Sequence, residues 1–153
     1  MSNDDFGMND FVETRIIRAV RELLAGAVND RLKELKFEVP VIEFGNYGDG
    51  HAISPVVTLA SCEQTEKERV IRQDVYSLTI TFSVQESEDS ELYCYAYSAA
   101  LGRTFYDDPT LGGIVDRAVI TGKKYIAPKK ANCGEEWGLI ITVRVTVEAS
   151  DKS

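Results

Sequence analysis

The chain has 153 residues, which is enough for one domain with its own core and too few to expect two. Its apolar fraction of 44%, charged fraction of 27% and aromatic fraction of 9% are those of an ordinary soluble globular protein and argue against a disordered chain. The formal charge of −8 argues against nucleic acid as the main partner, because DNA-binding surfaces neutralise phosphates with lysine and arginine.

Targeting signals and cysteine usage indicate the compartment. The first ten residues, MSNDDFGMND, lack the cationic start and apolar run of a signal peptide, and no stretch approaches the roughly 18 apolar residues of a membrane helix. The cysteines are odd in number and far apart, which indicates reduced thiols in a cytosolic protein: Cys62, Cys94 and Cys133. We expect a single domain over 1–153, with its core at about 10–149, loose tails at both ends, and no membrane partner.

Residues 10–35 predict the first helix. Apolar side chains recur there at steps of three and four, which is typical of an amphipathic helix: Phe11, Ile16, Val20, Leu23, Leu24, Ala27, Val28, Leu32 and Leu35. Asn9 or Asp10 is placed to cap the first turn. Gly26 costs about 1 kcal/mol relative to alanine, so we expect a close neighbour or a slight bend there within a continuous helix.

Strands are expected at 37–44 and 54–61, separated by a glycine-rich loop. Pro40 and Pro55 each lack a backbone donor, so these strands should begin at the proline or lie near a sheet edge. The clearest strands come later, at 75–85 and 137–148, where apolar residues alternate with mostly polar ones. Two long strands with one polar face indicate an antiparallel sheet that helices cover on one side only.

A second helix is expected at 87–106, with Ser87 as its cap and acidic residues in its first turn. A weakly alternating strand follows at 114–126, and residues 127–136 form the turn into the last strand. The predicted fold is therefore α+β: a two-layer sandwich, with a mainly antiparallel sheet of about five strands and two helices packed on one face.

No catalytic residue stands out. His51 is the only histidine, and a nucleophile with its base would need a Ser or Cys beside it, for which no motif such as GxSxG is present. An exposed loop histidine is the simpler interpretation. A small cytosolic enzyme that uses His51 with Asp49 and Cys62 is kept as an alternative.

Two further patterns suggest ligands only weakly. Gly45, Gly48 and Gly50 lie between two strands and lead into no helix, whereas a phosphate loop opens a helix, so a flexible loop is favoured over a nucleotide site. Tyr47 and His51 are candidate interface residues if this loop serves as an interaction finger. The aspartates between helix and strand lack the spacing of a calcium loop: Asp107, Asp108 and Asp116. We expect no metal and no cofactor.

The one local basic cluster consists of Lys123, Lys124, Lys129 and Lys130. The simpler interpretation is a solvated hairpin tip. The alternative is a tip that docks on an acidic surface, which the next copy of this acidic protein would supply.

The stretch DPTLGG is interpreted as a corner rather than a catalytic loop. Pro109 favours the second position of a turn and moves Asp108 out of helical geometry. Leu111 is placed to cover the core edge, and the two glycines permit positive φ. The residues of this structural corner are Asp108, Pro109, Thr110, Leu111, Gly112 and Gly113.

With a helix that ends at RTFYDD, this corner and a closing strand LIITVRVTVEA, the chain resembles bacteriophage tail terminator or tail completion proteins. The resemblance spans about residues 10–149. It implies a non-enzymatic subunit, commonly a homo-hexameric ring, that binds the tail tube protein, stops tube growth and meets the head connector protein. Such a protein works in the host bacterial cytoplasm during assembly and then in the virion.

A ring of this kind lets DNA pass, and the charge of −8 suggests an acidic lumen that discourages adhesion. Sequence-specific nucleic acid binding is not expected. Another neck or baseplate structural protein would share the same fold and charge and remains the nearest alternative.

Overall fold

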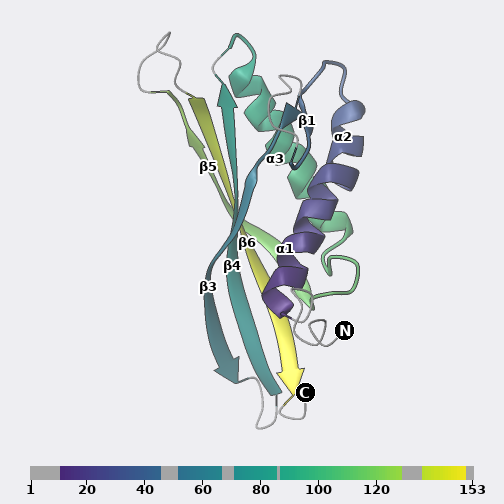
Figure 1. The fold of residues 1–153 in the computed structure, drawn as a ribbon, viewed down its shortest axis with the longest axis vertical. Helices are drawn as coiled ribbons and strands as arrows, with labels where there is room; N and C mark the ends of the chain where they lie inside the picture. Colours follow the sequence, from purple (N-terminus) through teal and green to yellow (C-terminus); the bar gives the residue numbers. More distant parts are fainter. Residues whose placement is uncertain (1–10, 46–51, 67–70, 86, 129–135, 151–153) are drawn as a thin grey trace.

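The computed structural model describes residues 11–45, 52–66, 71–85, 87–128 and 136–150. Its two layers are a four-stranded antiparallel sheet and a set of helices on one face of that sheet (Figure 1). The elements are α1 (Val12–Leu23), a π-helical turn (Leu24–Val28), α2 (Asn29–Lys33), β1 (Val41–Ile42), β2 (Ala52–Ile53), β3 (Val56–Glu66), β4 (Ile71–Gln85), α3 (Ser90–Asp107), β5 (Arg117–Ile126) and β6 (Glu136–Ser150). The predicted α+β class with helices on one face is confirmed.

The first helix is continuous from Val12 to Lys33 but contains a π-helical turn that the sequence pattern did not predict. Gly26 lies in this turn, and a Cβ added to it would meet nothing within 4 Å, so no close neighbour explains the glycine. Phe11 is the N-cap residue and gives no side-chain cap. The predicted caps, Asn9 and Asp10, lie outside the described residues.

The main sheet has the strand order β3-β4-β6-β5, so β3 and β5 are its two edges. The expected count of about five strands was too high by one, because most of 37–44 is not a strand and β1 pairs in parallel with β2 in a separate small sheet. Strands β1 and β3 begin directly after Pro40 and Pro55, as predicted for residues without a backbone donor.

Strands β3 and β4 extend further than the alternation of apolar residues indicated. Strand β3 continues to Glu66 and β4 begins at Ile71, so most of the polar segment CEQTEKERVIRQD belongs to the ends of two paired strands. Ladder hydrogen bonds, which need no apolar side chain, hold these ends together. Periodicity therefore could not find them.

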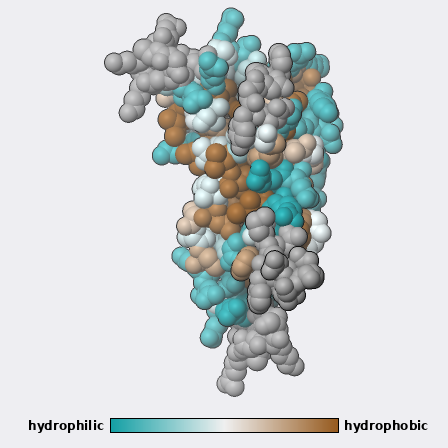
Figure 2. All heavy atoms as spheres, viewed as in Figure 1, coloured by the Kyte–Doolittle hydropathy of each residue, from teal (hydrophilic) through white to brown (hydrophobic). Residues whose placement is uncertain are grey.

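The core lies between the sheet and the helices. Strands β4 and β6 supply it by alternation: Tyr76, Leu78, Ile80, Phe82, Leu139, Ile141, Val143 and Val145. The ring of Phe82 stacks on that of Tyr97 in α3, with centroids 4.7 Å apart. Figure 2 shows apolar side chains gathered in the middle of the molecule, with hydrophilic ones above and below. One face of β4 and of β6 thus packs against the helices.

The start of α3 differs from expectation. Asp89 is the N-cap residue, without a side-chain cap, and Ser87 does not cap the helix. Instead the hydroxyl of Ser90 donates to the Ser87 carbonyl and accepts from its amide, at 3.0 and 3.2 Å. None of the helices in the described residues is long and apolar enough to cross a membrane.

Candidate assembly surface

The helix-free face of the sheet is rich in hydroxyl groups. Residues that alternate with the core positions point to this face, and those with hydroxyls are Thr58, Ser61, Thr65, Ser77, Thr79, Thr81, Ser83, Thr142 and Thr146. None of the described helices packs on this side (Figure 1). We call it the uncovered face. It offers polar, regularly spaced groups to a partner without exposing a core.

Strand β5 forms a basic edge. Its sequence, RAVITGKKYI, carries Arg117, Lys123 and Lys124 and no acidic residue. All three side chains are exposed, and none of them forms an ion pair within the described part of the chain. In an acidic protein, this edge concentrates unpaired positive charge.

Strand β3 forms an acidic edge. Its sequence, VVTLASCEQTE, carries Glu63 and Glu66 and no basic residue. Both residues are exposed, and neither forms an ion pair with another described residue. The two edges of one sheet therefore carry opposite charge.

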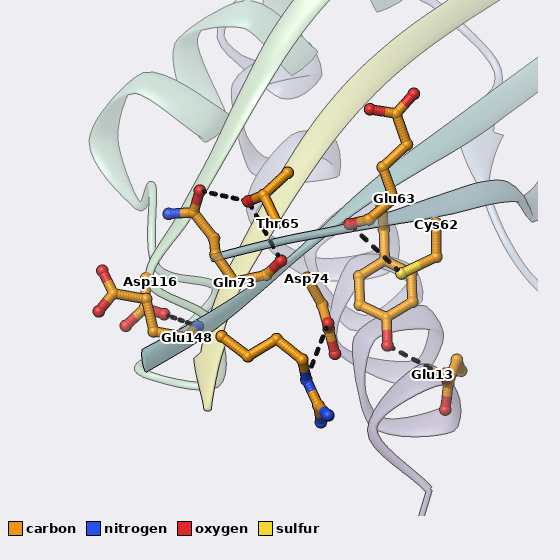
Figure 3. Close-up of polar contacts among 10 residues, drawn as sticks. Glu13, Cys62, Glu63, Thr65, Gln73, Asp74, Asp116 and Glu148 are labelled. Atoms are coloured by element: carbon orange, nitrogen blue, oxygen red, sulfur yellow. Dashed lines mark hydrogen bonds and ion pairs between the residues drawn. The ribbon is translucent and has the colours of Figure 1, made fainter. Parts of the chain in front are cut away.

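Several charges elsewhere in the molecule have local partners. Arg31 and Arg103 both contact the carboxylate of Asp107, which joins α2 to the end of α3. The Arg72 Nε lies 3.6 Å from Asp74 Oδ1, and Tyr76 donates to Glu13 Oε2 at 2.9 Å (Figure 3). The unpaired charges at the edges thus contrast with local pairs inside the subunit.

A hollow of about 620 Å³ lies on the uncovered face, near the end of the sheet where β3 and β6 finish. Its lining spans all four strands, from Glu63 on β3 to Arg117 on β5, with Arg144 between them. Figure 3 shows this end of the sheet and the Glu63 carboxylate pointing away from the Tyr76 and Glu13 pair. The uncovered face is therefore concave here and carries charges of both signs.

A second groove, of about 350 Å³, runs between α3 and β5. Tyr106, which is 78% exposed, and Lys123 line it together with the apolar residues of β5. Arg103 lies over the ring of Tyr106, 5.8 Å from its centroid. The basic edge is thus flanked by an exposed aromatic side chain.

The corner residues lie between α3 and β5, after Asp108 ends the helix. Asp108 Oδ1 accepts from the Gly112 amide at 3.0 Å, and Thr110 Oγ1 accepts from the Gly113 amide at 3.1 Å. Leu111 is 3% exposed and has a φ of 52°, and the two glycines have φ values of 72° and 93°. The Ala118 amide donates to the Pro109 carbonyl at 2.6 Å, which ties the corner to β5.

Several residues singled out from the sequence cannot be placed. Tyr47, His51, Lys129 and Lys130, with most of the glycine loop, lie outside the described residues. Lys123 and Lys124 lie within β5 itself rather than at a hairpin tip, because the strand continues to Ile126. These two lysines therefore belong to the strand expected at 114–126, and the hairpin-tip interpretation is wrong for them.

The three aspartates considered as metal ligands have structural partners instead. Asp107 pairs with two arginines, Asp108 caps the corner, and Asp116 Oδ2 accepts from the Glu148 amide. Among the residues that the structure describes, no group of three or more His, Cys, Asp or Glu side chains is placed to hold a metal ion. These carboxylates organise the chain around the corner.

The surroundings of Cys62 disfavour its thiolate. Partial desolvation, together with the negative charges of Asp74 and Glu13, raises the pKa of its thiol. A catalytic cysteine needs the opposite shift, because the thiolate is the reactive form. The other two residues of the enzyme alternative, His51 and Asp49, lie outside the described residues.

Sequence reasoning missed the acidic edge. Its signal was present, since Glu63 and Glu66 stand in a segment free of glycine and proline directly after a predicted strand. The segment lacks apolar alternation, so periodicity alone does not predict a strand there.

No model of a known protein family matches the chain, and no curated protein matches it. The functional interpretation therefore rests on the surfaces described above and on the sequence resemblance.

Proposed function

We propose that the protein is a structural subunit of a bacteriophage tail, a terminator-like protein that assembles head to tail into a ring. The ring caps the tail tube and meets the head connector. The observation that carries the proposal is the pair of long, open sheet edges of opposite charge, β3 and β5. The resemblance to that family, which the DPTLGG corner and the order of the elements carry, is the second support for the proposal.

Open edges favour assembly because each presents a row of unpaired N–H and C=O groups. Single-chain proteins usually blunt such edges, and charged side chains on an edge strand serve that purpose. Charges of one sign on one edge and of the other sign on the opposite edge have a further effect: they repel like edges and attract unlike ones. A head-to-tail contact then closes into a ring or continues into a filament, depending on its rotation.

DNA passing through such a ring should not adhere. The described strand charges on the uncovered face are mixed, with Arg117, Lys124 and Arg144 against Glu63, Glu136 and Glu148. The charge of −8 therefore arises mainly from other surfaces. The acidic residues on those surfaces would have to repel the DNA. Tight binding of duplex DNA to the purified protein at low salt would contradict this part of the proposal.

The decisive experiment is co-purification with the tail tube protein of the same phage or prophage, followed by electron microscopy of tube ends. We expect a ring at one end of each tube and tubes of limited length, with longer tubes when the protein is omitted. A protein that stays monomeric in the presence of tubes and leaves their length unchanged would contradict the function. Binding to a neck or baseplate component, with no effect on tubes, would instead favour the neighbouring structural role.

A further inference from the structure

We propose that the subunits join by pairing β5 of one copy with β3 of the next, with Arg117 opposite Glu63. This inference rests on the proposed ring and specifies how the ring is built. Both strands are edges of the sheet. Three antiparallel pairings connect them, so β3 and β5 run in opposite directions within one subunit. In a head-to-tail array, β3 of the next copy therefore runs antiparallel to β5. The alternation of the sheet continues across the joint.

The register follows from the rows of paired residues inside one subunit. Glu63 pairs with Val75, Val75 pairs with Thr146, and Thr146 pairs with Arg117. Glu63 and Arg117 are thus the two ends of a single row, and both point to the uncovered face. When the row continues into the next copy, its basic end meets an acidic end on the same face.

The face that packs against the helices continues in the same way. The row of Leu59, Leu78, Val143 and Ile120 ends in two partly buried apolar residues, one at each edge. Leu59 of one copy would pack against Ile120 of the other and complete the burial of both. The joint then has apolar contact on one face and a charge pair on the other.

Each edge strand carries an irregularity next to the same row of the sheet. Strand β3 has a register shift between Leu59 and Ser61, and β5 has one between Ile120 and Gly122. Both irregularities adjoin the row that contains Leu59 and Ile120. Because a bulge bends its strand, the two edges bend on opposite sides of this row, and the joint would pair Leu59 with Ile120 between the two bends.

Symmetric pairing of like edges is disfavoured by charge. Two β5 edges would bring three cations against three, and two β3 edges would bring two carboxylates against two. Like charges placed opposite each other on paired strands destabilise the pair. The unlike joint instead places Arg117 opposite Glu63, while Lys123 and Lys124 lie opposite the uncharged Val57 and Val56.

The test is a charge swap in the full-length protein. Glu63→Arg and Arg117→Glu each place like charges at every joint, so each variant should lose assembly, alone or on tail tubes, as measured by analytical ultracentrifugation and electron microscopy. The double variant Glu63→Arg/Arg117→Glu should recover it. Matched controls are Arg18→Glu and Glu22→Arg, which reverse the same charges at exposed positions of α1 and should assemble normally.

Circular dichroism checks that each variant folds, which is expected since both side chains are exposed and unpaired within the described chain. If the single variants assemble like the wild type, the edge joint is wrong while the ring function stands. If the wild type itself forms no ring with or without tubes, the proposed function fails first.

A cysteine pair tests the register independently. In a background with Cys62→Ser and Cys133→Ser, the pair Glu63→Cys/Arg117→Cys should form intermolecular disulfides on mild oxidation, because opposite residues in paired strands have Cβ atoms about 5 Å apart. The pair Ser61→Cys/Arg117→Cys lies two residues out of register and should form few. Efficient linking of the second pair, and not the first, would overturn the register.

Discussion

Asn29 binds both backbone groups of Ile42. Its Nδ2 donates to the Ile42 carbonyl at 2.8 Å and to the Ala25 carbonyl at 3.0 Å, and its Oδ1 accepts from the Ile42 amide at 2.8 Å. The side chain thus acts as a strand partner for β1, at the point where the π-helical turn passes into α2. Through this contact the helix holds the short parallel sheet.

We expect Asn29→Ala to lower the free energy of unfolding by about 2–4 kcal/mol, because two buried backbone groups lose their partner and each costs about 1–3 kcal/mol when unsatisfied. Urea denaturation followed by circular dichroism measures this. Asp30→Ala, at the exposed neighbouring position, should change stability by no more than about 0.5 kcal/mol. Equal effects of the two substitutions would show that the Asn29 contact carries no stability.

Substitution by alanine should lower the stability of the protein at the corner glycines and raise it at Gly26 of the first helix. Gly112→Ala and Gly113→Ala force a side chain into positive φ and should each destabilise by about 1–2 kcal/mol. Gly26→Ala adds a methyl group in open space on a helix and should stabilise by up to about 1 kcal/mol. Thermal unfolding measures all three, and a stabilising change at either corner glycine would contradict the positive φ values.

The hydroxyl of Tyr97 connects α3 to the start of β1, since it donates to the Pro40 carbonyl at 2.7 Å. The Tyr97 side chain is fully buried. Tyr97→Phe keeps the stack on Phe82 and should cost about 1–2 kcal/mol through the unpaired carbonyl. Tyr106→Phe, on the exposed face of the same helix, is the matched control and should be nearly neutral. If both cost the same, the hydrogen bond of Tyr97 contributes nothing.

Alkaline pH should unfold the protein through two tyrosines. Burial raises the pKa of both Tyr97 and Tyr76, and the hydrogen bond to Glu13 adds to the shift at Tyr76. Their contribution to stability is complete below the ordinary tyrosine pKa of about 10 and falls as the pH rises above it, because only the unfolded chain then releases these protons.

Tyrosinate absorbance and circular dichroism, followed together during an alkaline titration, test this expectation. Of the seven tyrosines, Tyr76 and Tyr97 should ionise only as the fold is lost. The double variant Tyr76→Phe/Tyr97→Phe, compared with itself at neutral pH, should lose less stability on alkalinisation than the wild type does. Early ionisation of all seven with the fold intact would contradict the prediction.

Local patterns predicted those parts of the fold in which one face of an element is apolar. The first helix and strands β4 and β6 were found because their core residues recur at the period of the helix or strand. The corner was predicted because proline restricts φ and glycine permits positive φ, whatever the surrounding structure. The π-helical turn was missed, since Gly26 and its neighbours carry no signal for it.

No local sequence pattern predicts that the two edges of the sheet carry opposite charge. Glu63 and Arg117 are separated in the sequence by strand β4 and helix α3, and only the pairing of β3, β4, β6 and β5 brings them to the ends of one row. The sequence alone established an acidic chain with one basic cluster and the types of its main elements. Which strands become edges, and which charges stay unpaired there, depends on long-range ladder hydrogen bonds, whose partners the tertiary structure selects.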